Sequence, residues 1–151
     1  MIKKQELNVG DVFSLRLNEK EIAFGRTLAK VSIGHAVEIF DYFSNSRIDY
    51  TKAIKQNRLM YPQIIDSYSL FKLKDEGEWK IEKHENEIFV CKDASEIKYA
   101  YGDKSNLKTI NILGEFEQQQ EGERFPPYSP KGDIQIKKII QFWRDKKVQD
   151  V

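Results

Sequence analysis

The stretch that decides the fold is residues 10–43, which read GDVFSLRLNEKEIAFGRTLAKVSIGHAVEIFDYF. Three runs within it are rich in β-branched and aromatic residues, as strands are: 12–17, 21–31 and 36–43. The short connections between these runs favour hairpins. Three consecutive strands joined by hairpins form an antiparallel meander, and such a sheet often curls towards a small barrel.

The second of these runs carries a two-residue period. Large side chains recur from Ile22 to Leu28 with smaller residues between them, which predicts a strand with one well-packed face. Gly25 interrupts this run. A glycine inside a strand is typical of a bulge, a bend or a close approach of another backbone.

Outside this stretch the chain gives weaker signals. Residues 46–59 indicate a short helix or an irregular crossover. Further strands are predicted at 63–71, around Trp79 and Ile81, from Ile97 to Tyr101, and at 106–116. The run 117–123 is too polar to pack and indicates an exposed loop, and the proline-rich residues 125–130 are expected to be extended.

The last part of the chain predicts a helix, because four apolar residues share one helical face: Ile136, Ile139, Ile140 and Trp143. Ile134 and Ile136 also alternate, so a strand followed by a shorter helix is the alternative. The sequence therefore predicts an α+β, mainly β fold in a single domain, residues 1–151. Its sheet would be a curled antiparallel sheet or a small SH3-like barrel, with a C-terminal helix.

Composition indicates a globular protein of a reducing compartment. With 151 residues, 40% hydrophobic and 32% charged, the chain can bury a core without disulfides or metal. Cys91 is the single cysteine, so no internal disulfide is expected. The first residues lack the apolar core of a signal peptide, and no apolar run reaches the ~20 residues that span a bilayer. We therefore expect a cytoplasmic protein that does not bind a membrane.

Charge is distributed unevenly along the chain, although the net charge is only +1. Residues 74–96 carry eight acidic side chains and four lysines, whereas residues 131–151 carry six basic and three acidic side chains. The balanced net charge gives no overall reason to expect a nucleic-acid partner. The local imbalance would steer a charged partner towards the acidic segment.

Residues that support catalysis or bind metals are sparse. Cys91 lies in an apolar, strand-like context, which predicts a buried structural thiol rather than a nucleophile. His35 and His84 lie far apart, and no spacing typical of a metal site or a phosphate loop is present. We therefore predict neither a metal nor another cofactor, and we expect His84 to be a solvated surface residue.

Acid–base chemistry has one candidate arrangement. Asp11, Arg26 and Asp41 lie on the first three predicted strands and could meet at one end of the sheet. Ordinary roles are the alternative, because Asp11 follows Gly10 in a turn and Arg26 could pair with either aspartate. Structural roles explain these residues better, and no enzymatic activity is expected.

The first three strands carry short motifs in a particular order. They are a Gly-Asp-x-Phe strand, an aromatic-Gly-Arg strand, a strand with Phe, Asp and Tyr, and a later Trp-x-Ile element, at Gly10, Asp11, Phe13, Gly25, Arg26, Phe40, Asp41, Tyr42 and Trp79. This order resembles the opening of the immunity protein 26 family. Phe40 and Asp41 are adjacent here, a small departure from the third motif. The resemblance covers residues 8–44 well and the middle of the chain loosely.

The resemblance implies a cytoplasmic bacterial antidote, which neutralises a cognate polymorphic toxin by occluding the toxin's active site. The partner would be a protein toxin domain rather than a membrane or a nucleic acid, and the oligomeric state stays open. Under this hypothesis the acidic segment is the candidate contact surface for a basic toxin: Glu76, Glu78, Glu82, Glu85 and Glu87.

Two alternatives remain open. A Gly-Asp-Val strand that leads into a Gly-Arg strand is also similar to the start of toxin endoribonucleases with small SH3-like barrels. Those carry an Arg-Pro pair where this chain has Arg26 and Thr27. The other alternative is a nucleic-acid-binding regulatory module that uses the basic C-terminal helix, in which Trp143 lies among basic residues.

Overall fold

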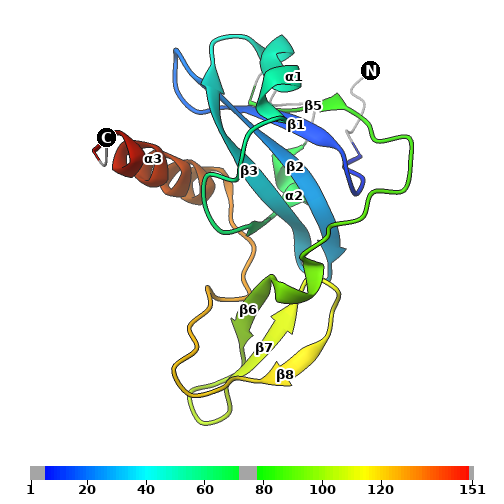
Figure 1. The fold of residues 1–151 in the computed structure, drawn as a ribbon, viewed down its shortest axis with the longest axis vertical. Helices are drawn as coiled ribbons and strands as arrows, with labels where there is room; N and C mark the ends of the chain where they lie inside the picture. The colour runs from blue at the N-terminus through cyan, green and yellow to red at the C-terminus, as the bar shows by residue number, and fades with distance from the viewer. Residues whose placement is uncertain (1–5, 72–77, 150–151) are drawn as a thin grey trace.

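Two antiparallel sheets organise the computed structural model, which describes residues 6–71 and 78–149 (Figure 1). The main sheet has the strand order β4-β3-β2-β1-β5, and the small sheet has the order β6-β7-β8. The fold is therefore α+β and mainly β, as predicted. The main sheet is not closed into a barrel, because β4 and β5 form its two edges and do not pair with each other. The curled open sheet is the correct one of the two predicted forms.

The predicted meander forms the centre of the main sheet. Its strands are β1 (Val12–Arg16), β2 (Ile22–Val31), β3 (Gly34–Ser44), β4 (Gln63–Ile65) and β5 (Trp79–Lys83). β1 pairs with β2 from Val12↔Arg26 to Arg16↔Ile22, and β2 pairs in turn with β3. All of these pairings are antiparallel, so short hairpins suffice to connect the three strands, as their sequences predict.

Gly25 lies where β2 changes its register against β3, between Ala23 and Gly25. A Cβ atom at this position would lie 2.5 Å from the Phe13 ring and 2.6 Å from the Glu38 carbonyl oxygen. The strand glycine thus marks both a register shift and a close approach. It leaves room for Phe13, whose ring stacks on Trp79 with 5.8 Å between centroids.

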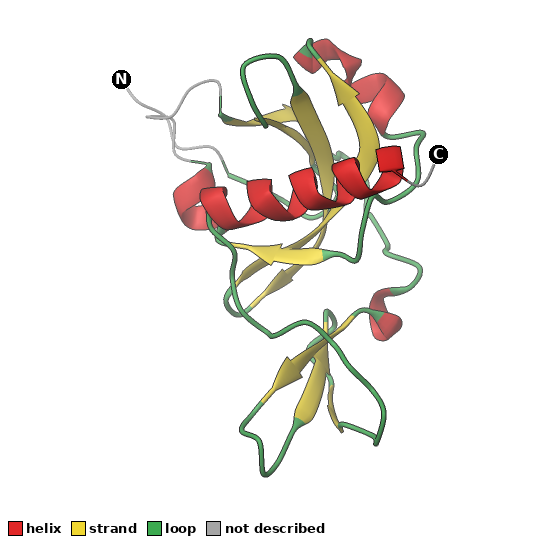
Figure 2. Cartoon of the chain, turned by 90° about the vertical axis from the view of Figure 1, so that its left-hand side faces the viewer, coloured by secondary structure: helices red, strands yellow, loops and turns green. Residues whose placement is uncertain are grey.

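The main sheet packs on both faces, so the prediction of a single well-packed face on β2 is wrong. Ile22 and Phe24 pack against α1 (Tyr50–Ala53) on one face. Ala23, which points the other way, packs in the cluster that includes α3 (Asp133–Gln149). Figure 2 shows α3 crossing that face of the sheet. A helix on each side buries residues of both parities.

The connection after β3 contains a 3₁₀ turn (Arg47–Asp49) followed by α1, which confirms the predicted short helix or crossover. The strand predicted at 63–71 is only partly correct. β4 ends at Ile65, and α2 (Ser67–Leu70) follows directly. The chain turns there because the Asp66 carbonyl accepts the Leu70 amide at 3.2 Å, which begins a helical turn.

The small sheet lies at the bottom of Figure 1, and its Tyr99 and Ile110 share a buried cluster with Leu28 and Ile64 of the main sheet. It follows a 3₁₀ turn (Ala94–Glu96) and consists of β6 (Lys98–Tyr101), β7 (Lys108–Asn111) and β8 (Phe116–Gln118). The single strand predicted at 106–116 is therefore wrong, because the chain reverses after Asn111. The Asn111 side chain accepts the Leu113 and Glu115 amides, both at 3.0 Å, and Gly114 has a φ of +87°.

The predicted loop at 117–123 begins inside a strand, because Glu117 and Gln118 belong to β8, although both are exposed as expected. The proline-rich segment is extended. The Ala100 amide of β6 donates to the Pro126 carbonyl, and the Lys131 amide donates to the Ile64 carbonyl of β4, both at 2.8 Å. This segment therefore connects the small sheet to the edge of the main sheet.

The apolar face of α3 is confirmed. Ile136 and Ile140 are fully buried in the main core, and Ile139 and Trp143 pack against it. The alternative of a strand before a shorter helix is wrong, because the helix already begins at Asp133 and leaves Ile134 exposed. Among the helices of the described residues, none is long and apolar enough to cross a membrane.

Candidate functional site

The Gly-Asp motif fastens the start of β1 to the segment after β5. Gly10 has a φ of +91°, and its amide donates to the Thr27 carbonyl at 2.8 Å. Asp11 is fully buried, and its carboxylate accepts the amides of Asn8 (2.9 Å) and Glu85 (2.8 Å). His84 Nδ1 lies 2.9 Å from the same carboxylate, so this exposed histidine has a specific partner. The buried carboxylate therefore has a structural role.

The remaining motif residues also build the scaffold. The Arg26 guanidinium lies over the rings of Phe40 (5.7 Å) and Phe89 (5.3 Å), and its Nε atom is buried without a hydrogen-bond acceptor among the described residues. Tyr42 packs near Phe24 at 6.1 Å. On β3, Asp41 donates its backbone amide to the Asn57 carbonyl at 2.8 Å. Arg26 therefore lies against two aromatic rings, whereas the Asp11 carboxylate bonds to Asn8, His84 and Glu85.

Trp79 joins the motif strands to the C-terminal helix. Its ring is buried, stacks on Phe13 and meets Phe71 edge-on at 5.7 Å. Its indole Nε1 donates to the Asp133 carboxylate at 2.7 Å. In α3, Lys137 lies 2.9 Å from the same carboxylate. The Trp-x-Ile element thus connects the sheet to the first turn of α3.

The five predicted acidic contact residues do not lie in equivalent positions, and Glu76 lies outside the described residues. Glu78 accepts Lys137 Nζ at 2.5 Å. The Glu82 side chain is only 9% exposed and accepts the Ser14 hydroxyl at 2.6 Å. Glu85 is half-buried, and Glu87 is exposed. Glu85 also accepts the Glu87 amide at 3.1 Å, so three of the four described residues have partners inside the protein. Glu87 is the most outward of the four.

The basic helix proposed for nucleic-acid binding is also engaged with the rest of the protein. Lys137 pairs with Glu78 and Asp133. Arg144 pairs with Glu21, and Trp143 packs against the main core. These groups serve first to hold the helix on the sheet.

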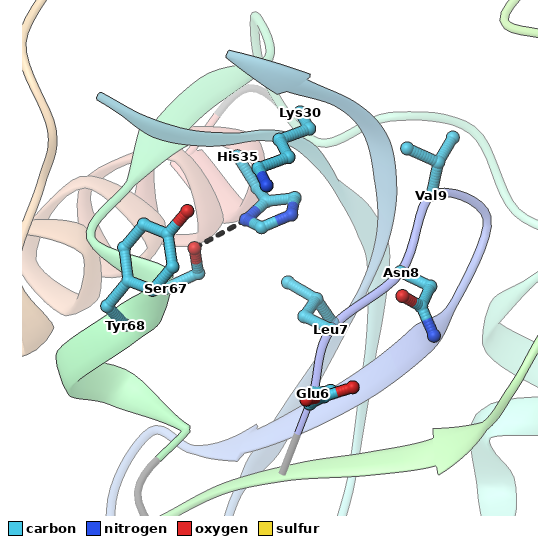
Figure 3. A pocket seen from close by; sticks show the side chains of 8 residues that line it. All are labelled: Glu6, Leu7, Asn8, Val9, Lys30, His35, Ser67 and Tyr68. Carbon is cyan, nitrogen blue, oxygen red and sulfur yellow. Dashed lines mark hydrogen bonds between the residues drawn. The ribbon is translucent and has the colours of Figure 1, made fainter. Parts of the chain in front are cut away.

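A pocket of about 370 Å³ opens between the segment before β1 and α2 (Figure 3). His35 and Ser67 lie at its base, with the imidazole Nδ1 2.5 Å from the hydroxyl. Lys30 and Tyr68 line the same pocket. Burial and the nearby Lys30 charge lower the pKa of His35, while Asp11 opposes that shift. The pocket therefore presents the His35 imidazole, the Lys30 ammonium group and the hydroxyls of Ser67 and Tyr68 to any polar ligand that enters it.

A second polar cluster holds the loop after β5 against the main sheet. The Arg58 guanidinium donates to both Asp93 oxygens, at 2.5 and 3.0 Å, and to Glu38 at 2.9 Å. Hydrogen bonding from Arg58 lowers the pKa of Asp93 from 3.8 to about 2. This loop is therefore fixed by an ion-pair cluster rather than by strand pairing.

Cys91 lies in this loop and is half-buried, so the prediction of a buried structural thiol in a strand-like context is only partly correct. Its Sγ atom lies 3.2 Å from the Asp93 carboxylate. Burial, together with this hydrogen bond, raises the pKa of the thiol from 9.0 to about 11. At neutral pH a thiol with a pKa raised in this way is protonated.

The small sheet presents an exposed aromatic surface that the sequence did not suggest. Phe116 is 56% exposed and Tyr101 is 48% exposed. Their rings meet edge-on across β7 with 5.5 Å between centroids, and Tyr101 also contacts Tyr128 at 6.1 Å. Exposed aromatic side chains already held in place by neighbours are typical anchors of protein–protein interfaces.

No group of three or more His, Cys, Asp or Glu side chains within residues 6–71 and 78–149 is placed to hold a metal ion.

The sequence could not reveal the pocket or the Arg58 cluster, because their members are distant in the chain. His35 and Ser67 are separated by 32 positions, and Arg58 and Asp93 by 35.

Comparison with known proteins supports the resemblance seen in the motifs. The family model described as immunity protein 26 matches residues 8–88. No curated protein and no solved structure matches the chain. The matched residues contain every motif position and all five strands of the main sheet, whereas the small sheet and α3 follow it in the chain. The match spans more than half of the 151 residues. The chain therefore belongs to the immunity protein 26 family.

Proposed function

We propose that this protein neutralises a cognate bacterial polymorphic toxin in the cytoplasm by binding over the toxin's active site. The observation that carries the proposal is the family match over residues 8–88. Inhibition by occlusion requires a stable scaffold and a complementary surface, and it needs no chemistry from the inhibitor.

The packing of the main sheet indicates which surfaces remain available to a toxin. Both faces of its central strands are covered by the protein's own helices, α1 on one side and α3 on the other. The surface offered to a toxin therefore lies at strand edges, on loops or on the small sheet. Phe116 and Tyr101 supply apolar contact area, and Glu85 and Glu87 keep their predicted role of attracting a basic partner.

The test is a rescue experiment with the toxin domain encoded by the adjacent gene. We expect cells that express this domain to survive only when the antidote is co-expressed. The purified pair should form a stable one-to-one complex. Unchanged toxicity together with no complex would refute the proposal.

Occlusion is tested separately from binding. A toxin variant inactivated at its catalytic residue should still bind the antidote, and the toxin's substrate should compete with the antidote for it. A complex in which the toxin still turns over its substrate at the uninhibited rate would contradict the mechanism.

A further inference from the structure

The two edges of the small sheet differ. The edge at β6 is covered, because the Ala100 amide donates to the Pro126 carbonyl and the Tyr128 amide donates to the Ala100 carbonyl at 2.9 Å. The opposite edge is β8, and all three of its residues are exposed. Within the described residues, β7 is the one strand paired with β8. A strand edge of this kind is a ready site for another strand.

Alternation along β8 decides which backbone groups face outward. The Glu115 carbonyl accepts the Asn111 amide, and the Gln119 amide donates to the Leu107 carbonyl just before β7, both at 3.1 Å. Glu117 lies between these two bonds and pairs with β7. In an antiparallel ladder the intervening residues point the other way. The amides and carbonyls of Phe116 and Gln118 therefore face away from β7.

These outward groups are largely unpaired within the described chain. The Gln118 carbonyl accepts the Gln120 side chain at 3.3 Å. The Gln118 side chain itself bonds back to Asn106 and the Leu107 carbonyl, both at 3.1 Å, which anchors the strand without covering its edge. The backbone of β8 is thus held in an extended form with its outer donors and acceptors accessible.

Acidic residues are frequent within and next to this strand in the sequence: Glu115, Glu117, Glu121 and Glu123. No basic residue occurs in the sequence between Lys108 and Arg124. Lys98 reaches Glu117 from β6, with 3.1 Å between charged atoms. If two copies paired β8 to β8, the remaining carboxylates would repel one another. A strand that carries Lys or Arg would instead meet opposite charge.

We propose that β8 receives an extended, basic segment of the toxin as an added strand of the small sheet. The segment would bond to the outward groups of Phe116 and Gln118, place its Lys or Arg side chains near Glu115 and Glu121, and cover the Phe116 ring. Backbone pairing provides affinity in this mode, and the flanking side chains provide selectivity. The inference rests on the proposed function and names the surface that performs it.

Amide hydrogen exchange on the wild-type protein gives the direct test. On binding the toxin domain, the amides of Phe116 and Gln118 should exchange at least about tenfold more slowly. The amide of Glu117, already bonded within the sheet, serves as the internal control and should change less. A neutralising complex in which the two outward amides exchange at their free rates would overturn the inference.

Variants test the backbone and the charges independently. Gln118→Pro removes one outward N–H together with the side-chain bonds to Asn106 and Leu107, whereas Gln118→Ala removes only those side-chain bonds. We expect the proline variant to bind at least about tenfold more weakly than the alanine variant. The double reversal Glu115→Lys with Glu121→Lys should slow association by about tenfold at low salt. Its control changes the net charge equally on the main-sheet side of the molecule, at the exposed Glu6 and Glu19, and should bind as the wild type does.

The outcomes separate the two proposals. If the wild-type protein neither rescues cells nor binds the toxin domain, the proposed function fails. If the wild type rescues and both sets of β8 variants bind with wild-type affinity, the function stands and the β8 inference is wrong.

Discussion

The two sheets of this protein use their aromatic residues in opposite ways. In the main sheet, Phe13 and Trp79 are buried and stacked, and Gly25 leaves the space that the Phe13 ring occupies. In the small sheet, Phe116 and Tyr101 also touch, but both remain about half exposed. The first pair is part of the core, whereas the second leaves apolar surface exposed to solvent.

The family match follows the same division. It covers the main sheet and ends before the small sheet begins. The motif residues lie within this match and help to build the scaffold, through the Asp11 carboxylate and the Trp79 indole. A scaffold of this kind can carry different partner surfaces, because fold alone does not determine function. The following substitutions test this contrast.

The largest effect is expected where α3 completes the main core. Ile140→Ala should lower the free energy of unfolding by about 2–5 kcal/mol, because a fully buried side chain would leave a cavity. Phe142→Ala on the same helix is the control, since Phe142 is exposed. Urea unfolding of both variants measures the difference. Equal loss in the two would contradict the assigned packing of the helix.

The buried Asp11 carboxylate should rank next. Asp11→Ala leaves the Asn8 and Glu85 amides without their acceptor, which should cost about 2–3 kcal/mol of unfolding free energy. Asp11→Asn keeps one acceptor oxygen and should lose less. Thermal unfolding compares the two variants. If Asp11→Ala is as stable as the wild type, the motif does not have the structural role described here.

A smaller, pH-dependent effect is expected at the Arg58 cluster. The lowered pKa of Asp93 means that its pairing stabilises the fold fully above pH 3.8 and loses that contribution as the pH falls towards about 2. Arg58→Gln should return the pKa of Asp93 towards 3.8 and flatten stability across this window. A carboxyl titration by NMR would decide, and an unchanged Asp93 titration would exclude Arg58 as the cause.

The smallest effect on stability is expected on the small sheet. Phe116→Ala removes a ring that is more exposed than buried, so the free energy of unfolding should change by about 0.5 kcal/mol or less. Affinity for the toxin domain should nevertheless fall by about tenfold. Calorimetry of the free protein and of the complex gives both values. A large loss of stability without loss of binding would reverse the contrast between the sheets.

Local patterns predicted the parts of the fold that depend on neighbouring residues. The two-residue period of β2 and the helical spacing of Ile136 and Ile140 each indicated the correct element, and Gly25 marked its own close contact. Breaks in strands were harder to predict. A turn at Asp66 and another at Asn111 depend on local hydrogen bonds to one residue each, and they interrupt otherwise strand-like runs.

The candidate sites were less predictable because they form across long separations. The acidic segment looked continuous in sequence, but Glu82 turns inward to Ser14, which lies 68 positions earlier. The outer edge of β8 could not be predicted, because the polar run 117–123 indicates a loop, whereas Glu117 lies in a strand. Which side chains face solvent is decided by tertiary pairing, and composition does not record it.

The position of α3 has a consequence for synthesis of the protein. The Trp79 indole acquires its hydrogen-bond partner only after Asp133, 54 residues later, has been translated. Ile136 and Ile140, which cover the sheet, follow Asp133 in the chain. While the ribosome is still translating these residues, the nascent strands expose apolar side chains, and such surfaces are prone to aggregate. We therefore expect a polypeptide that terminates before α3 to aggregate or to be degraded rather than to accumulate in folded form.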